Sequence, residues 1–221
     1  MAEMIFYGPL MKNYQVSSVY IGGGTPSYID EQWIAALMEG VFDCFNVLPD
    51  AEISIECNPG TLSREKLLAY RDAGINRLSI GLQSANNDEL KLLGRIHTFE
   101  QFVTNYEVAR NVGFKNINVD LMYGLPGQSA SQYMATVNKI IRLHPDHISA
   151  YSLIVEKGTP FYEKYKFDMV RQEAGMRRSF CLTRTSYMIW KRRDRRRLWM
   201  PATGSMRHLT MLKEVWSAAI I

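Results

Sequence analysis

The chain has no apolar run long enough to cross a membrane, and its N-terminus lacks the basic, apolar and small-residue succession of a signal peptide. These two absences argue against a membrane-spanning or exported protein. With 47% hydrophobic residues, the 221-residue chain can fill a substantial core, enough for one large domain or two small ones. We therefore expect a globular protein in the cytoplasm.

Cysteine is also scarce, because Cys44, Cys57 and Cys181 are the only three and lie far apart. An odd number of distant thiols fits neither a disulfide framework nor a closely spaced metal-binding knuckle. We expect Cys44 on a helix and Cys57 on a strand, both as small buried hydrophobic residues. From the sequence we assign no metal ligand and no catalytic residue.

Charge is unevenly distributed, although the net charge of the whole chain is only +4. Residues 177–221 hold 11 Lys and Arg against 2 Asp and Glu, a net charge of +9. The residues before them carry 15 against 20, a net charge of −5. In the basic tail, Trp190 and Trp199 lie beside runs of arginine, a composition that suits phosphate contacts and base stacking. Nucleic-acid binding is therefore one alternative function.

Short β-rich runs alternate with segments of helical periodicity between Val16 and about Tyr165. The predicted strands are 18–22, 52–57, 77–81, 116–122 and 147–152. The predicted helices are 2–12, 30–45, 63–72, 98–111 and 129–143, with N-caps at Asp30, Ser63, Thr98 and Ser129 and C-caps at Gly74 and Gly113. This succession predicts an α/β fold with parallel strands, either an open sheet or a (β/α) barrel. Both folds bind ligands at the carboxyl ends of their strands.

Glycines and polar side chains concentrate just after the predicted strands. The first strand runs into Gly22-Gly23-Gly24-Thr25-Pro26, where glycines let the backbone approach a polar small molecule closely and turn away. Other strand ends supply Glu56, Gln83 and Asp120. Two carboxylates, an amide and a glycine turn on one rim predict a binding site for a small molecule.

Four motifs closely resemble the radical S-adenosylmethionine (SAM) family: IGGGTPS (21–27), IECNPG (55–60), RLSIGLQS (77–84) and DLMYGLPGQ (120–128). Within that family they resemble the oxygen-independent coproporphyrinogen III oxidase group. The motifs SLIVE (152–156) and GTP (158–160) resemble more narrowly its haem chaperone branch. The match covers about residues 2–176, in order and at family spacing. It implies a partial parallel (β/α) barrel of the radical SAM type that lacks its first β unit, and a role in porphyrin or haem metabolism.

The resemblance implies SAM as a cofactor and assigns part of its binding to the glycine turn. Gly23, Gly24 and Thr25 would hold the amino and carboxylate end of SAM through backbone groups. Glu56 would accept hydrogen bonds from the amino group or the ribose. The alternative for Glu56 is a purely structural one, the capping of a neighbouring helix.

Four further cofactor contacts follow from the same resemblance. Gln83 and Arg95 would bind SAM directly, since arginine can grip a carboxylate with two hydrogen bonds. Asp120 would face the ribose, and Ile154 would lie against the adenine. The structural alternatives are that Gln83 satisfies backbone groups, that Arg95 pairs with an acidic residue at the surface, and that Asp120 caps a loop.

The cluster motif of the family, Cys-x3-Cys-x2-Cys, is absent from the 221 residues. Its three thiolates hold a [4Fe-4S] cluster, and the three distant cysteines cannot replace them. We therefore expect that this chain cannot cleave SAM reductively, and that it begins inside the family fold without the first β unit. Permitted codons for residues 208–221, read in a shifted frame, resemble the family's continuation, so we also expect the reading frame to slip near residues 176–179.

The expected organisation is a helix at residues 1–15, a partial radical SAM domain at 16–170, and an aberrant basic tail at 171–221, disordered or non-native. A slipped frame makes the arginines of the tail accidental, so we do not favour nucleic-acid binding. A remaining alternative is a residual module that binds SAM, haem or a porphyrin. Iron of haem would need an axial ligand, and the candidates are His97, His144, His147 and His208, with His97 the best placed.

Overall fold

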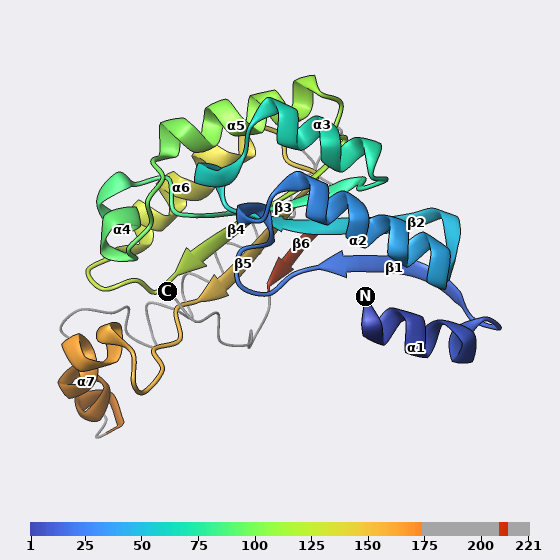
Figure 1. The fold of residues 1–221 in the computed structure, drawn as a ribbon. Coiled ribbons are helices and arrows are strands. Elements are labelled where there is room, and N and C mark those ends of the chain that lie inside the picture. Colours follow the sequence, from blue (N-terminus) through green and yellow to red (C-terminus); the bar gives the residue numbers. More distant parts are fainter. Residues whose placement is uncertain (174–207, 212–221) are drawn as a thin grey trace. The chain divides into compact units, whose positions relative to one another are not determined.

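The computed structural model describes residues 1–173 and 208–211 (Figure 1). The strands form one sheet in the order β1-β2-β3-β4-β5-β6. The pairs β1–β2, β2–β3 and β5–β6 are parallel. The strands are β1 (Gln15–Ile21), β2 (Asn46–Cys57), β3 (Arg77–Gln83), β4 (Asn116–Tyr123), β5 (His147–Ser152) and β6 (His208–Met211). The helices are α1 (Ala2–Met11), α2 (Glu31–Cys44), α3 (Arg64–Asp72), α4 (Asn87–Leu92), α5 (Phe99–Asn111), α6 (Ala130–Ile141) and α7 (Pro160–Glu173), with 3-10 turns η1 (Pro26–Tyr28) and η2 (Pro59–Thr61).

The expected alternation of strands and helices is confirmed, and so are most of the expected caps. Asp30 accepts a hydrogen bond from the backbone of Gln32 at the start of α2, and Ser63 and Ser129 cap α3 and α6. Gly74 follows α3 with a φ of 87°, a backbone conformation that favours glycine. Three elements were not predicted, namely α4, α7 and β6.

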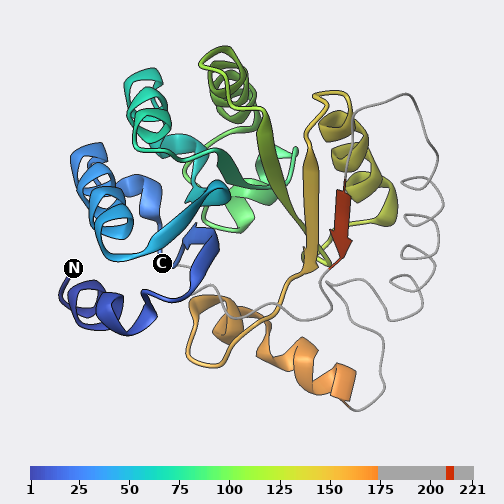
Figure 2. The same ribbon diagram turned by 90° about the vertical axis from the view of Figure 1, so that its right-hand side faces the viewer.

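Contacts between residues divide the chain into two compact units. The first unit comprises Met1–Gly81 and Glu100–Asn118. Its helices α2, α3 and α5 lie along one side of its strands, with α3 and α5 side by side (Figure 2). Arg71 of α3 donates a hydrogen bond of 2.6 Å to the carbonyl oxygen of Val112, just after α5. The core of this unit is fully buried at Met38, Ile55, Leu67, Tyr70, Leu78 and Phe102.

The second unit comprises Leu82–Phe99 and the residues from Val119 onward. It contains α4, α6 and β5, and β5 lies beside β6 (Figure 2). Below the carboxyl ends of its strands, Tyr151 and Leu153 pack against an apolar cluster. That cluster consists of Leu93, Met122 and Leu125. Residues that precede and follow the end of β5 are thus anchored by apolar packing.

Of the expected basic tail, the structure describes only part. His208–Met211 forms β6, which pairs with β5 in parallel. Residues 171–173 are the end of α7, and the rest of the tail, including Cys181, lies outside the described residues. The expected domain boundaries and the slipped frame therefore stay predictions. Within residues 1–173 and 208–211, no helix has both the length and the hydropathy needed to cross a membrane.

Candidate functional site

The glycine turn after β1 has the backbone conformation that its sequence predicts. Gly23 and Gly24 have φ angles of 86° and 53°, in the left-handed region that side chains with a Cβ rarely adopt. A Cβ built at either glycine would meet no protein atom within 4 Å. The turn therefore needs glycine for its backbone angles, while the space in front of it is open. Thr25 follows as an exposed residue before η1.

Glu56, the penultimate residue of β2, holds this turn in place. Its Oε2 accepts a hydrogen bond of 3.2 Å from the backbone N–H of Gly23. Its Oε1 accepts one of 2.6 Å from the hydroxyl of Tyr20, a residue of β1. Each carboxylate oxygen can accept two hydrogen bonds, so Glu56 retains acceptor capacity for a ligand. Neither donor belongs to a helix, so Glu56 does not act as a helix cap.

A second set of hydrogen bonds fixes the segment that leaves the turn. The hydroxyl of Ser27, which is fully buried, accepts a bond of 2.9 Å from the backbone of Asn58 and lies 2.6 Å from the Thr61 hydroxyl. The ammonium of Lys66 donates to the Ser27 carbonyl oxygen at 2.8 Å. These contacts join the segment after β1 to the segment after β2. Sequence reasoning missed both Tyr20 and Ser27, because each contact joins residues more than thirty positions apart.

In the second unit, Gln83 ends β3 in an unusual conformation. Its φ is 73°, and the N–H of Ser84 donates to the carbonyl oxygen of Leu82 at 3.0 Å across it. This is a γ-turn of the rare and strained kind. The side chain is buried, and its Oε1 accepts a hydrogen bond of 2.6 Å from the hydroxyl of Tyr151. Because that bond uses the amide oxygen, the amide N–H groups of Gln83 are left to donate.

Arg95 lies three residues after the end of α4, directly after a left-handed Gly94 with a φ of 68°. The backbone N–H of Arg95 donates to the carbonyl oxygen of Leu90 at 2.9 Å, which closes the helix. Burial lowers the pKa of Arg95, while the neighbouring Tyr151 and Asp120 act in the opposite direction. Its Nε is buried and has no hydrogen-bond partner among the residues that the structure describes. A buried N–H of this kind can donate to an acceptor oxygen on a ligand.

Ile154, the last of the expected contacts, follows β5. Its side chain is 50% exposed, so it can lie against a ligand. The residue before it, Leu153, is anchored by a hydrogen bond of 2.9 Å from its N–H to the carbonyl oxygen of Tyr123. The structure thus brings two pairs of the expected residues together, one in each unit, and within its described residues shows no such contact for Thr25 or Ile154. Gly23 and Glu56 share a hydrogen bond in the first, and Arg95 and Asp120 interact electrostatically in the second.

The two cysteines among the described residues do not fit an iron–sulfur cluster. Cys44 ends α2 and Cys57 ends β2, as expected, and Cys57 is buried whereas Cys44 is only half-buried. No group of three potential metal ligands occurs in the described part of the chain. His97 is 2% exposed, and its Nε2 lies 3.3 Å from the carbonyl oxygen of Leu82. A haem iron bound through Nε2 would have to displace that contact.

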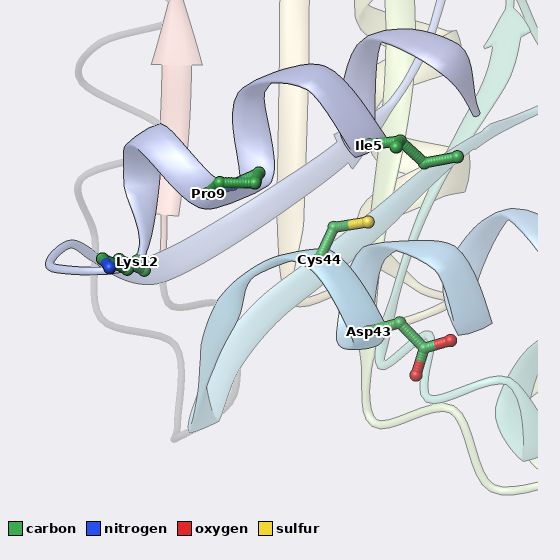
Figure 3. Close-up of a pocket in the computed structure, with 6 residues that line it drawn as sticks. Ile5, Pro9, Lys12, Asp43 and Cys44 are labelled. Carbon is green, nitrogen blue, oxygen red and sulfur yellow. The ribbon is translucent and has the colours of Figure 1, made fainter.

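A pocket of the first unit lies away from the carboxyl ends of the strands. It is lined by Ile5, Gly8 and Pro9 of α1, by Lys12 directly after α1, and by Asp43 and Cys44 of α2 (Figure 3). Because α2 ends just before β2 begins, this pocket is at the amino end of β2, whereas Glu56 is at its carboxyl end. We assign no ligand to it.

Comparison with known proteins identifies the family. A model of the radical SAM superfamily matches residues 9–140. The haem chaperone HemW of Bacillus subtilis (strain 168) is 41% identical over 148 residues, which cover 66% of this chain and 39% of that protein. The mitochondrial radical S-adenosyl methionine domain-containing protein 1 of Bos taurus is 38% identical over 148 residues, which cover 67% of this chain and 34% of that protein.

The solved structure of coproporphyrinogen III oxidase (HemN) from Escherichia coli, described as a radical SAM enzyme, superposes with a TM-score of 0.73 at 28% identity. The superposition covers 89% of this chain and 43% of that one, and the chain spans 39% of the curated bacterial HemW that it matches. These findings confirm the expected fold class, part of a parallel (β/α) barrel. The chain belongs to the radical SAM superfamily, in the branch that contains HemN and HemW.

Proposed function

We propose that this chain binds SAM at the carboxyl ends of its strands, as part of a protein that handles haem or a porphyrin. One observation carries the proposal. The Glu56 carboxylate holds a turn whose two left-handed glycines, Gly23 and Gly24, face open space. A bare backbone of this kind lets a polar ligand come within hydrogen-bond distance of main-chain groups.

In the first unit, backbone groups of Gly23, Gly24 and Thr25 bind the amino-acid end of SAM, and Glu56 accepts from its amino group or ribose. When a [4Fe-4S] cluster is bound beside it, SAM supplies the radical chemistry of the family. The sequence holds no Cys-x3-Cys-x2-Cys motif, so the proposal for these 221 residues stops at binding. Absence of reductive cleavage stays a prediction.

In the second unit, Gln83 and Arg95 donate hydrogen bonds to acceptor atoms of SAM. The unpartnered, buried Nε of Arg95 supports this role. Asp120 accepts from a ribose hydroxyl, and Ile154 covers the adenine with its exposed apolar side chain. Each of these assignments follows from the family resemblance and awaits a binding measurement.

The test compares two glycines with the same backbone conformation. Gly23 and Gly158 both have a φ of 86°, and a Cβ at either would meet no protein atom within 4 Å. Gly23→Ala and Gly158→Ala therefore impose the same unfavourable φ on alanine, but only Gly23 lies in the turn that Glu56 holds. We expect Gly23→Ala to weaken binding of SAM at least about tenfold and Gly158→Ala to leave it within about twofold, measured by isothermal titration calorimetry on the full chain. Equal binding by the two variants, or no binding by the wild-type chain, would refute the proposal.

Haem or a porphyrin as a ligand rests on the names of the relatives, HemW being called a haem chaperone and HemN a coproporphyrinogen III oxidase. A titration with haemin tests it, because axial ligation would produce a saturable shift of the Soret band. A linear response would reject haem binding by this chain. The expected cytoplasmic location stays a prediction, as does the absence of nucleic-acid binding.

A further inference from the structure

The turn at Gln83 needs support from its surroundings. A non-glycine residue with a φ of 73° is strained, and it persists where neighbouring groups hold it. Gln83 is 3% exposed, so water does not supply that support. The residue that closes the turn is Ser84, whose side chain is fully buried. Whatever holds Ser84 therefore holds Gln83.

The carboxylate of Glu89 is one partner of Ser84. The Ser84 hydroxyl donates to Oε2 of Glu89 at 2.5 Å and accepts from the backbone N–H of Asn86 at 3.0 Å. Glu89 lies on α4 and is 7% exposed. Two contacts to α6 support the same loop: the N–H of Ala85 donates to the Thr136 hydroxyl at 3.3 Å, and Lys139 donates to the Ala85 carbonyl oxygen at 3.1 Å.

The same carboxylate oxygen also holds the loop after β4. Oε2 of Glu89 accepts a hydrogen bond of 3.0 Å from Nε2 of Gln128, a buried residue. Oε1 of Gln128 in turn accepts from the backbone N–H of Gly124 at 3.0 Å and from that of Leu125 at 3.5 Å. Gly124, which has a φ of 78°, lies four residues after Asp120. One oxygen atom thus joins the loop that follows Gln83 to the loop that follows Asp120.

The other oxygen of Glu89 shows which property of the side chain matters. Oε1 is buried and makes no hydrogen bond within the described residues. Only one of the two carboxylate oxygens of Glu89 therefore takes part in the network. An amide in place of the carboxylate keeps that acceptor, so Glu89→Gln should preserve the network, whereas Glu89→Ala removes it.

We propose that Glu89 is a positioning residue: it fixes the two loops at this rim of the second unit, and through them the orientation of Gln83. The inference rests on the proposed binding of SAM for its functional consequence. Its structural part, the joining of the two loops, does not depend on any ligand.

The experiment has two readouts on the full chain, hydrogen exchange and binding of SAM. In Glu89→Ala we expect the backbone amides of Asn86 and Gly124 to exchange about tenfold faster, and SAM to bind about tenfold more weakly. Glu89→Gln should keep both readouts within about twofold of the wild type, since it retains the acceptor. Val137→Ala is the matched control, because Val137 is buried on α6 and takes no part in the network.

The outcomes separate this inference from the proposed function. Unchanged exchange at Asn86 and Gly124 in Glu89→Ala would overturn the inference, whatever the binding result. Equal weakening of SAM binding by Glu89→Ala and Val137→Ala would also overturn it, because general loss of stability would then suffice. If the wild-type chain does not bind SAM, the proposed function fails, and the exchange data alone decide whether Glu89 holds the two loops.

Discussion

Two carboxylates hold turns at the carboxyl ends of the strands, one directly and one through another side chain. In the first unit, Glu56 accepts directly from the N–H of Gly23, in a left-handed glycine turn. In the second, Glu89 reaches the N–H of Gly124, also in a left-handed turn, through the amide of Gln128. Glu56 is half-buried, whereas Glu89 is 7% exposed.

This difference in burial indicates which of the two carboxylates can also bind a ligand. A side chain that fixes a turn and contacts a ligand must keep an accessible lone pair, as the half-buried Glu56 does. A side chain that only fixes loops can be buried, provided that its partners are satisfied. The comparison predicts that Glu56 contributes mainly to binding and Glu89 mainly to stability and order.

The largest expected effect separates these two contributions directly. Glu89→Ala leaves the buried Gln128 amide without its acceptor and the Ser84 hydroxyl with only the Thr136 hydroxyl at 3.5 Å, so we expect it to lower the free energy of unfolding by about 2–3 kcal/mol. Glu56→Ala leaves the Gly23 N–H able to reach water, so we expect a loss below about 1 kcal/mol. Urea denaturation followed by circular dichroism measures both values.

The two variants serve as controls for each other, since each removes one carboxylate beside a glycine turn. Relative to its loss of stability, Glu56→Ala should weaken SAM binding more than Glu89→Ala does. A Glu56→Ala variant as unstable as Glu89→Ala would erase the distinction between the two carboxylates.

A smaller effect tests the strain at Gln83. Gln83→Ala and Gln83→Gly both remove the side chain and its bond to Tyr151, but only glycine adopts a φ of 73° freely. We expect the glycine variant to be more stable than the alanine variant by about 1–2 kcal/mol, because that is the cost of a left-handed backbone for a residue with a Cβ. Urea denaturation of the two variants gives this difference.

Ser149, within β5, does not have a positive φ, so its alanine and glycine variants provide the matched control pair. There, Ser149→Ala should be more stable than Ser149→Gly, since glycine weakens the interior of a strand. If the glycine variant is more stable than the alanine variant at Gln83 but less stable at Ser149, the backbone at Gln83 is strained. The same order at both positions would show that the turn at Gln83 costs nothing.

Much of the fold and part of the site could be predicted because their signals are local. Residues close together in the sequence indicate the glycine turn, the position of Glu56 at a strand end, and the caps of α2, α3 and α6. The start of β2 was placed too late, at Glu52 instead of Asn46, because Pro49 and Asp50 are typical of a loop. The β1–β2 register shifts over this segment, from Val16↔Val47 to Ser18↔Glu52, and such an irregularity accommodates proline within a strand.

The supporting residues of the second unit could not be predicted in the same way. Glu89 lies on a six-residue helix with the sequence NDELKL, which reads as an exposed polar segment. Its partner Gln128 is 39 positions away, and Tyr151 is 68 positions from Gln83. Burial of these polar groups results from long-range packing, for which a single sequence holds no local signal.

The smallest expected effect concerns a buried titratable group at the rim of the second unit. Burial lowers the pKa of His97 below its ordinary value of 6.5, and the nearby Arg95 lowers it further, while the contact with the Leu82 carbonyl oxygen opposes them. As the pH falls below about 6.5, the unfolded chain therefore binds a proton that the folded chain does not. Folding stability should decrease by up to about 1.4 kcal/mol per pH unit until the folded-state pKa is reached. Urea denaturation between pH 7.5 and about pH 5.5 measures this slope.

His97→Gln isolates the contribution of this residue, because glutamine can still donate to the Leu82 carbonyl oxygen but does not titrate. The exposed His144, which has a φ of 53°, provides the control as His144→Asn, since asparagine tolerates that backbone conformation. Other groups that titrate in this range contribute equally to all three proteins. The slope should therefore flatten more in His97→Gln than in His144→Asn. An unchanged slope in His97→Gln would mean that His97 is protonated as readily in the folded chain as in the unfolded one, which its burial and its electrostatic interaction with Arg95 argue against.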